Sequence, residues 1–191
     1  MKLGGVIYLQ TIAEKRMKGT TLRNLKMFRR LCGEDALKMV VLGTTNWGEV
    51  ERDVGEHRER QLRGNFWKDM IRLESKMRRF ENTPSSAQGF LNFILDRNER
   101  RILSSSSNDS ALLIQKELVD LQRSLPETKA GAELRYTIQQ LLNLQKGNVN
   151  SEEEAVVYRK LKKQMNALSI PFGRQLLRLF VSHSHSFRKS G

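Results

Sequence analysis

The chain has 191 residues, of which 38% are hydrophobic and 29% charged, and its formal net charge is +13. This length suits one domain with an appendage, and no run approaches the roughly 18 apolar residues of a membrane-spanning helix. The basic balance favours anionic partners, but basic and acidic residues are mixed along the whole chain, which is typical of a solvated surface and argues against nucleic-acid binding.

The cysteine and histidine content excludes several kinds of site. A single cysteine, Cys32, excludes an internal disulfide and a multi-cysteine metal site, and it fits a reducing compartment. It falls on the apolar side of an expected helix, so we expect a buried side chain and not a nucleophile. His57, His183 and His185 lack partners at metal-ligand spacing, and the N-terminus lacks a secretory signal. We therefore expect a cytoplasmic protein with no metal site.

Strand and helix signals alternate along the first half of the chain. Val6–Leu9 is rich in β-formers and predicts a strand. A helix follows, with Thr20 or Thr21 as its cap and Gly33 as its end. A continuous apolar run from Met39 to Gly43 predicts a strand buried on both faces, as in a parallel sheet covered by helices.

The alternation continues to about residue 103. A charged helix is expected from Glu49 to about Arg63, and a short helix at Phe66–Ile71. Residues 77–82 predict a third, weaker strand, and Ser85 or Ser86 would cap the helix that follows. This order is that of a parallel α/β sheet, of which three strands make about half. Because the first strand begins so near Met1, we expect that a segment upstream is missing.

A polar stretch, 104–110, separates this α/β portion, 1–103, from a helical arm, 111–169. The arm contains a seam spaced as in coiled coils, which favours self-association or a protein partner, or else packing onto the domain. Pro126 would make the helix kink or restart, and Ser151 opens a last helix with a capping box. The tail, 170–191, is basic and amphipathic, so it either contacts an anionic membrane surface or packs on the chain itself. The seam consists of Ile114, Leu118, Leu121, Leu125, Thr128 and Ala132.

Gly43 and Gly48 have the spacing of the first half of a phosphate-binding loop. Such a loop continues Gly-Lys-Ser/Thr, because the lysine neutralises phosphate charge and the hydroxyl holds Mg²⁺. Here Glu49 and Val50 follow Gly48, and the full motif occurs nowhere in the chain. We conclude that this stretch does not bind phosphate.

Short segments spread over roughly residues 4 to 168 carry a family resemblance. They are Gly5–Leu9, Arg16-Met17, Gly19-Thr20, Arg23-Asn24, Met27-Phe28, Leu31–Glu34, Leu37-Lys38, Val40–Leu42, Thr44-Thr45, Trp47, Glu49-Val50, Phe80–Thr83, Ser86-Ala87, Ile114-Gln115, Glu117–Asp120, Thr128 and Ala130-Gly131. Taken together and in order, they resemble a fungal family of P-loop GTPase-type proteins related to the immunity-associated nucleotide-binding GTPases. Gln10 and the Ala13-Glu14 pair depart from that pattern.

The resemblance implies that this chain corresponds to the second half of a GTPase domain, a partial P-loop GTPase-like parallel sheet. The phosphate loop and both switches of the family would lie upstream, with the GTP and Mg²⁺ that they bind. This chain is then expected to hold no cofactor of its own, to lack catalytic residues, and to retain at most residual GTP binding.

The resemblance also implies a site for the guanine base, at Thr45, Trp47 and Asn82. GTPases recognise the base through Asn/Thr-Lys-x-Asp, and Thr45–Gly48 occupies that place here, with Gly48 where the acidic acceptor is expected. Trp47 would stack on the base or pack against the edge of the sheet. Asn82 would contact the base or form an Asx turn before the next helix.

Two functions remain from the sequence. One is a truncated, catalytically inactive G domain of the P-loop GTPase superfamily, a family of GTP-binding hydrolases, that contacts a guanine nucleotide. The other is a non-enzymatic helical interaction module that docks acidic partners or a membrane surface.

Overall fold

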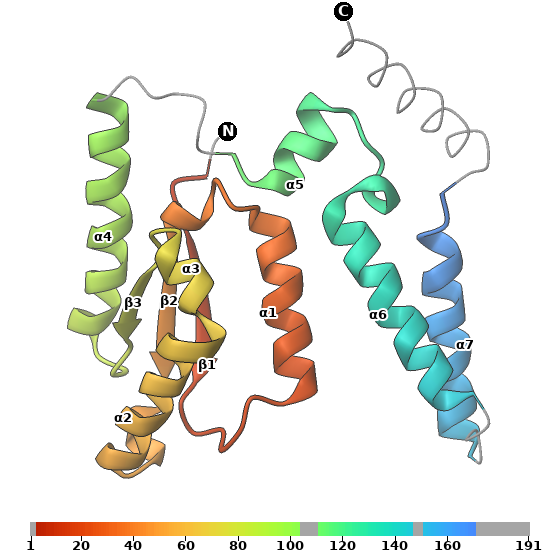
Figure 1. The fold of residues 1–191 in the computed structure, drawn as a ribbon, viewed down its shortest axis with the longest axis horizontal. Helices are drawn as coiled ribbons and strands as arrows, with labels where there is room; N and C mark the ends of the chain where they lie inside the picture. The colour runs from red at the N-terminus through yellow and green to blue at the C-terminus, as the bar shows by residue number, and fades with distance from the viewer. Residues whose placement is uncertain (1–2, 104–110, 147–150, 171–191) are drawn as a thin grey trace, which may run out of the picture. The chain divides into compact units, whose positions relative to one another are not determined.

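Three parallel strands form one sheet in the computed structural model, which describes residues 3–103, 111–146 and 151–170 (Figure 1). The strands are β1 (Val6–Thr11), β2 (Val40–Thr45) and β3 (Lys76–Arg79), and they lie side by side in chain order. Val6 pairs with Val40 in the first ladder and Val41 with Lys76 in the second. The prediction of a mixed α/β portion with a three-stranded parallel sheet and flanking helices is confirmed.

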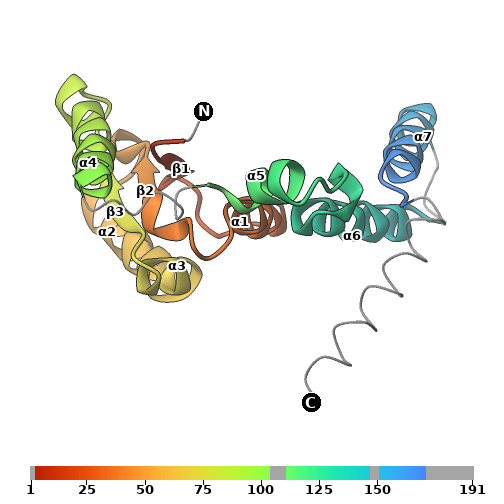
Figure 2. The same cartoon turned by 90° about the horizontal axis from the view of Figure 1, so that it is seen from above.

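Helices cover both faces of this sheet (Figure 2). On one face lie α1 (Gly19–Cys32), which joins β1 to β2, and α3 (Lys68–Arg72). The segment from β2 to α3 also contains η2 (Trp47–Glu49), α2 (Arg52–Gln61) and the π-turn η3 (Leu62–Phe66). On the opposite face lies α4 (Pro84–Leu103). A Cβ added to Gly43 of β2 would stand 2.9 Å from the ring of Phe90 of α4 and 2.5 Å from Leu9 of β1. Because Gly43 has no side chain, α4 packs close to the middle of the sheet.

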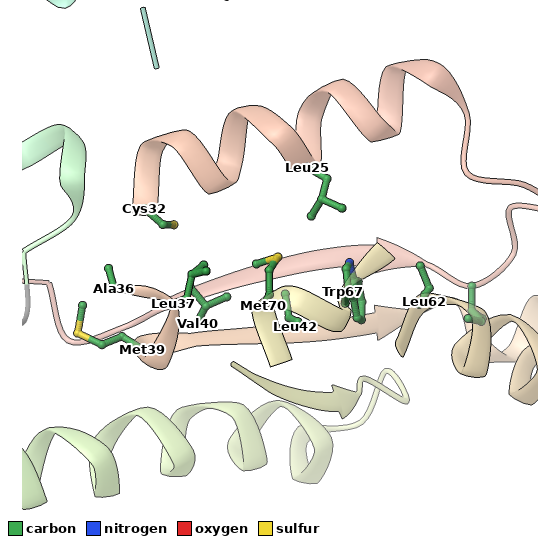
Figure 3. Close-up of a cluster of buried hydrophobic side chains, with 11 residues drawn as sticks. Leu25, Cys32, Ala36, Leu37, Met39, Val40, Leu42, Leu62, Trp67 and Met70 are labelled. Carbon is green, nitrogen blue, oxygen red and sulfur yellow. The ribbon is translucent and has the colours of Figure 1, made fainter. Parts of the chain in front are cut away.

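The main core lies between the sheet and helix α1 (Figure 3). Val40 and Leu42 of β2 are fully buried, and Leu25 and Cys32 of α1 lie over them with Trp67 from the start of α3. Burial raises the pKa of the Cys32 thiol to about 12, so this cysteine is an inert hydrophobe at neutral pH. Tyr8 completes the layer through its contact with the ring of Phe28, at 4.8 Å between centroids.

Several element boundaries differ from the sequence predictions. Helix α1 begins at Gly19 after Lys18, so neither Thr20 nor Thr21 is its cap. Helix α4 begins at Pro84, and the hydroxyl of Thr83 accepts a hydrogen bond from the backbone N–H of Ser86 at 3.1 Å, so Thr83 is the cap and not Ser85 or Ser86. Proline at the first helical position suits this start, because its missing N–H needs no partner there.

The strands and the charged helix also shift by a few residues. Met39 belongs to the 3₁₀ turn η1 (Leu37–Met39), β1 extends to Thr11, and β3 ends at Arg79, three residues before Asn82. The charged helix begins at Arg52, because η2 occupies the positions up to Glu49.

The C-terminal region is helical but holds no continuous seam. It comprises α5 (Leu113–Gln115), η4 (Lys116–Asp120), η5 (Leu125–Glu127), α6 (Lys129–Gln145) and α7 (Glu152–Ala167). Leu121 and Leu125 are 57% and 49% exposed and Thr128 caps α6, so the seam predicted from Ile114 to Ala132 is interrupted. The restart of the helix after Pro126 and the capping box at Ser151 are confirmed.

The chain divides into two compact units after residue 121, so the boundary does not fall in the polar stretch 104–110. Leu112 packs against the core of the first unit, and an ideal Cβ on Gly33, which has a φ of 73°, would stand 2.6 Å from Leu113. The first part of the expected helical arm therefore folds with the sheet. The tail predicted at 170–191 lies, except for its first residue, outside the described residues. The described helices include none that is both long and apolar enough to cross a membrane.

Candidate functional site

The carboxyl ends of the three parallel strands bring separate loops to one edge of the sheet. Just after β1, the N–H of Ile12 donates to the carbonyl oxygen of Thr45 at 2.8 Å. Just after β3, the N–H of Phe80 donates to the carbonyl oxygen of Thr44, also at 2.8 Å. These two bonds align the three strand ends. This is the edge where ligands collect in open α/β sheets.

The loop after β2 is held by Trp47. The preceding residue, Asn46, has a left-handed backbone with φ of 64°, which turns the chain back over the sheet. The indole N–H of Trp47 donates to the hydroxyl of Thr44 at 3.0 Å, and its ring lies against Gly55, whose ideal Cβ would stand 2.9 Å away. This geometry favours the second alternative for Trp47, packing against the sheet edge.

Arg79 at the end of β3 covers a face of the Trp47 ring. Its guanidinium carbon lies 4.2 Å from the ring centroid, within cation–π range. The same guanidinium donates from Nε to Glu59 of α2 at 3.0 and 3.1 Å, and from Nη2 at 2.5 Å. The hydrogen bond with Glu59 raises the Arg79 pKa further, as does the charge of Glu56. Arg79 thus ties β3, α2 and the Trp47 loop together.

Thr45 and Asn82 differ in how accessible they are. Thr45 ends β2, half-buried, with its carbonyl already bonded to β1. Asn82 is exposed with a left-handed backbone, φ 56°. Its turn is held by Ser86, whose Oγ accepts from the N–H groups of Glu81 and Thr83 at 3.2 Å. Because the Asn82 side chain bonds to none of the described residues, the Asx turn does not form among them.

A surface depression lies at the same edge, between the loops after β1 and β2. Arg58 fixes the first loop by donating to the carbonyls of Ile12 and Ala13 at 2.8 and 2.9 Å. None of Thr45, Trp47 and Asn82 lines the depression. Its lining is Thr11, Ala13, Glu14, Lys15, Arg16, Lys18, Asn46 and Glu49.

Glu49 is a functional candidate that the sequence reasoning passed over. It is exposed in the depression, and the amide of Asn46 donates to its carboxylate and so orients it. The structure therefore places an exposed carboxylate one residue after Gly48, the residue that stands where the resemblance implies the acidic acceptor. The signal was present in the sequence, since Glu49 is the first acidic residue after Trp47.

The described residues include no group of three or more His, Cys, Asp or Glu side chains placed to hold a metal ion. Comparisons of the chain with protein-family models, with curated proteins and with solved structures found no match.

Proposed function

We propose that the sheet portion of this chain is the base-side half of a G domain of the P-loop GTPase superfamily and that it binds guanine nucleotides weakly. One observation carries the proposal. Adjacent parallel strands, β2 and β3, bring two groups to one sheet edge: an oriented carboxylate, Glu49, and the exposed amide of Asn82, which has no partner among the described residues.

Guanine offers donors and acceptors that match these groups. Its ring N–H and 2-amino group are donors that a carboxylate accepts, which gives Glu49 the role of base acceptor. The Asn82 amide can donate to the base carbonyl. Thr45 and Trp47 form the end of β2 and the wall of the loop, and so position Glu49 without touching the base.

The proposal is confined to the base. The chain has no Gly-x-x-x-x-Gly-Lys-Ser/Thr, and phosphoryl transfer depends on that loop and on Mg²⁺ for charge stabilisation. We therefore propose no hydrolysis by this chain alone.

The test is an NMR titration of the full chain with GMP and, separately, AMP. Adenine presents an acceptor where guanine has its ring N–H, so we expect the amide signals of Asn46, Glu49 and Asn82 to shift with GMP alone, with a Kd on the order of 1 mM. Glu49→Gln should remove the preference, whereas Glu51→Gln, an exposed matched control, should keep it. Equal shifts with both nucleotides, or none, would refute the proposal.

The second candidate, a helical interaction module, rests on the α6–α7 hairpin. Five large apolar residues on these helices are exposed: Leu134 (37%), Tyr136 (55%), Leu144 (70%), Val156 (52%) and Val157 (46%). Exposed apolar side chains near the basic residues Lys160 and Lys163 suit an acidic partner surface. We expect the chain to bind anionic lipid vesicles or acidic peptides but not neutral vesicles, and to lose this binding in Val156→Gln, which removes the apolar side chain without changing the charge. No binding by the unaltered chain would contradict the proposal. A cytoplasmic location remains a prediction.

A further inference from the structure

Helix α7 has one face toward α6 and a stripe of exposed side chains on another face (Figure 1). Its partly buried residues recur every three or four positions, at Ala155, Tyr158, Leu161 and Met165, so they share the face that packs on α6. Exposed residues recur at the same spacing along a different line of the helix. This exposed stripe consists of Glu153, Val156, Val157, Lys160, Gln164 and Ala167.

The exposed stripe is its own complement when the helix is reversed. Glu153 and Lys160 each lie three and a half residues, or about 5 Å along the helix axis, from the point midway between Val156 and Val157. If two α7 helices met antiparallel with a two-fold axis at that point, Glu153 of each copy would lie level with Lys160 of the other. The valines, 52% and 46% exposed, would then meet between the two charge pairs and leave water.

The two charged groups of the stripe are available for such a contact. Glu153 and Lys160 are exposed, and neither forms an ion pair with a described residue. Their neighbours Glu152 and Arg159 differ, because they already bond to each other within the helix at 2.8 Å. The unpaired charges are therefore the ones that flank the valines.

The order of charges along the stripe selects a second copy as the partner. A lipid headgroup layer would pair Lys160 alone and leave Glu153 facing like charge, whereas a reversed copy pairs both. The net charge of +13 on each copy opposes association. At an ionic strength of about 0.15 M, however, repulsion beyond about 8 Å is largely screened, and paired side chains lie closer than that.

We infer that α7 is the interface of an antiparallel, two-fold dimer of this chain, with Val156 and Val157 at its centre and an ion pair between Glu153 and Lys160 on each side. The inference rests on the second candidate function and deepens it, because it names a second copy as the partner of the α6–α7 hairpin. The contact is small, and contacts of this size are weak, so we expect a Kd on the order of 100 µM.

Sedimentation equilibrium of the full chain, at concentrations around this Kd and in about 0.15 M salt, is the test. Glu153→Lys and Lys160→Glu should each weaken dimerisation by about tenfold or more, because each puts like charges opposite one another on both sides of the axis. An equimolar mixture of the two variants should dimerise as the unaltered chain does. In the mixed dimer, both lysines of one copy face both glutamates of the other.

Lys162→Glu is the matched control for the charge change. Lys162 is an exposed residue of α7 outside the stripe, so this substitution should leave dimerisation unchanged. Lys160→Glu lowers the net charge by the same amount, and it should weaken the dimer although the repulsion between whole copies falls. The pair of variants thus separates local pairing from the effect of net charge.

Added cysteines report the direction of the helices. With oxidised glutathione, Val157→Cys should form disulfide-linked dimers, because the two copies of residue 157 lie beside the axis. Ala167→Cys should form none, because in an antiparallel pair the two copies of residue 167 would stand about 30 Å apart. Cys32 is buried and should not react in either variant.

Several results would overturn the inference. They are a monomer at every concentration, a variant mixture that does not dimerise, equal effects of Lys160→Glu and Lys162→Glu, and either no cross-link at residue 157 or cross-links at both residues 157 and 167. A chain that stays monomeric but binds acidic peptides would overturn the dimer and leave the second candidate function standing.

Discussion

Removing the Arg79 guanidinium tests whether the Trp47 loop is held as described. Arg79→Ala deletes the cation–π contact at 4.2 Å and the paired hydrogen bonds to Glu59, whose side chain is only 14% exposed. The cation–π contact contributes about 1 kcal/mol in a partly exposed setting. The ion pair contributes about another 1 kcal/mol, since the Arg79 side chain is 34% exposed and solvent screens it. We expect the free energy of unfolding to fall by about 2 kcal/mol.

The assay is urea denaturation followed by circular dichroism, with the indole N–H signal of Trp47 as a local probe. Arg78→Ala is the matched control, because Arg78 is the preceding residue of β3, is exposed, and lies 5.5 Å from the centre of the Phe93 ring with no ion pair to the described residues. It should cost less than about 0.5 kcal/mol. Arg79→Lys should fall between the two, because lysine keeps the charge and loses the planar fork. Equal losses for Arg79→Ala and Arg78→Ala, or an unmoved Trp47 signal, would refute the reasoning.

Two further predictions concern residues away from the site. Gly131→Ala would place a Cβ 2.0 Å from the carbonyl oxygen of Leu125. We therefore expect urea denaturation to show that the free energy of unfolding of the second unit falls by more than about 2 kcal/mol. Gly64→Ala, whose Cβ would meet nothing within 4 Å, should leave the free energy of unfolding unchanged. Cys32 should resist Ellman's reagent at pH 8 in the folded chain and react in urea. Because its pKa rises from 9.0 to about 12 on folding, stability should fall as the pH rises above 9, by up to about 1.4 kcal/mol per pH unit, and Cys32→Ala should reduce that fall. A reactive folded thiol, or an alanine at residue 131 without cost, would contradict these accounts.

The alternation of strands and helices could be predicted because each element depends on a local pattern. A run of apolar β-formers such as Val40–Leu42 has one suitable place in an α/β fold, the middle of the sheet. Gly33 ends α1 as predicted, because a left-handed backbone suits glycine. Local patterns of apolar residues and of helix ends were therefore enough to predict a three-stranded parallel sheet with flanking helices.

The contacts that decide the candidate site join residues far apart in the chain. Trp47 was open to two interpretations until Arg79, 32 residues later, was seen over its ring. Thr83, Ser85 and Ser86 are all good caps by composition, and only the hydrogen bond to the Thr83 hydroxyl separates them. The apolar seam from Ile114 to Ala132 was predicted as continuous for a similar reason. A spacing of three and four residues between apolar side chains does not show where a helix stops, and here it stops before Pro126.

The central position of β2 also determines how the sheet can assemble. Val6 pairs with Val40 and Val41 with Lys76, so each ladder closes a loop of roughly 35 residues, at a similar cost in chain entropy. Neither outer strand touches the other, and β2 is the only surface on which either can order among the described strands. Such non-local pairing slows folding relative to a helical protein of this size. Within the described sheet, β1 and β3 can therefore pair only once β2 is in place.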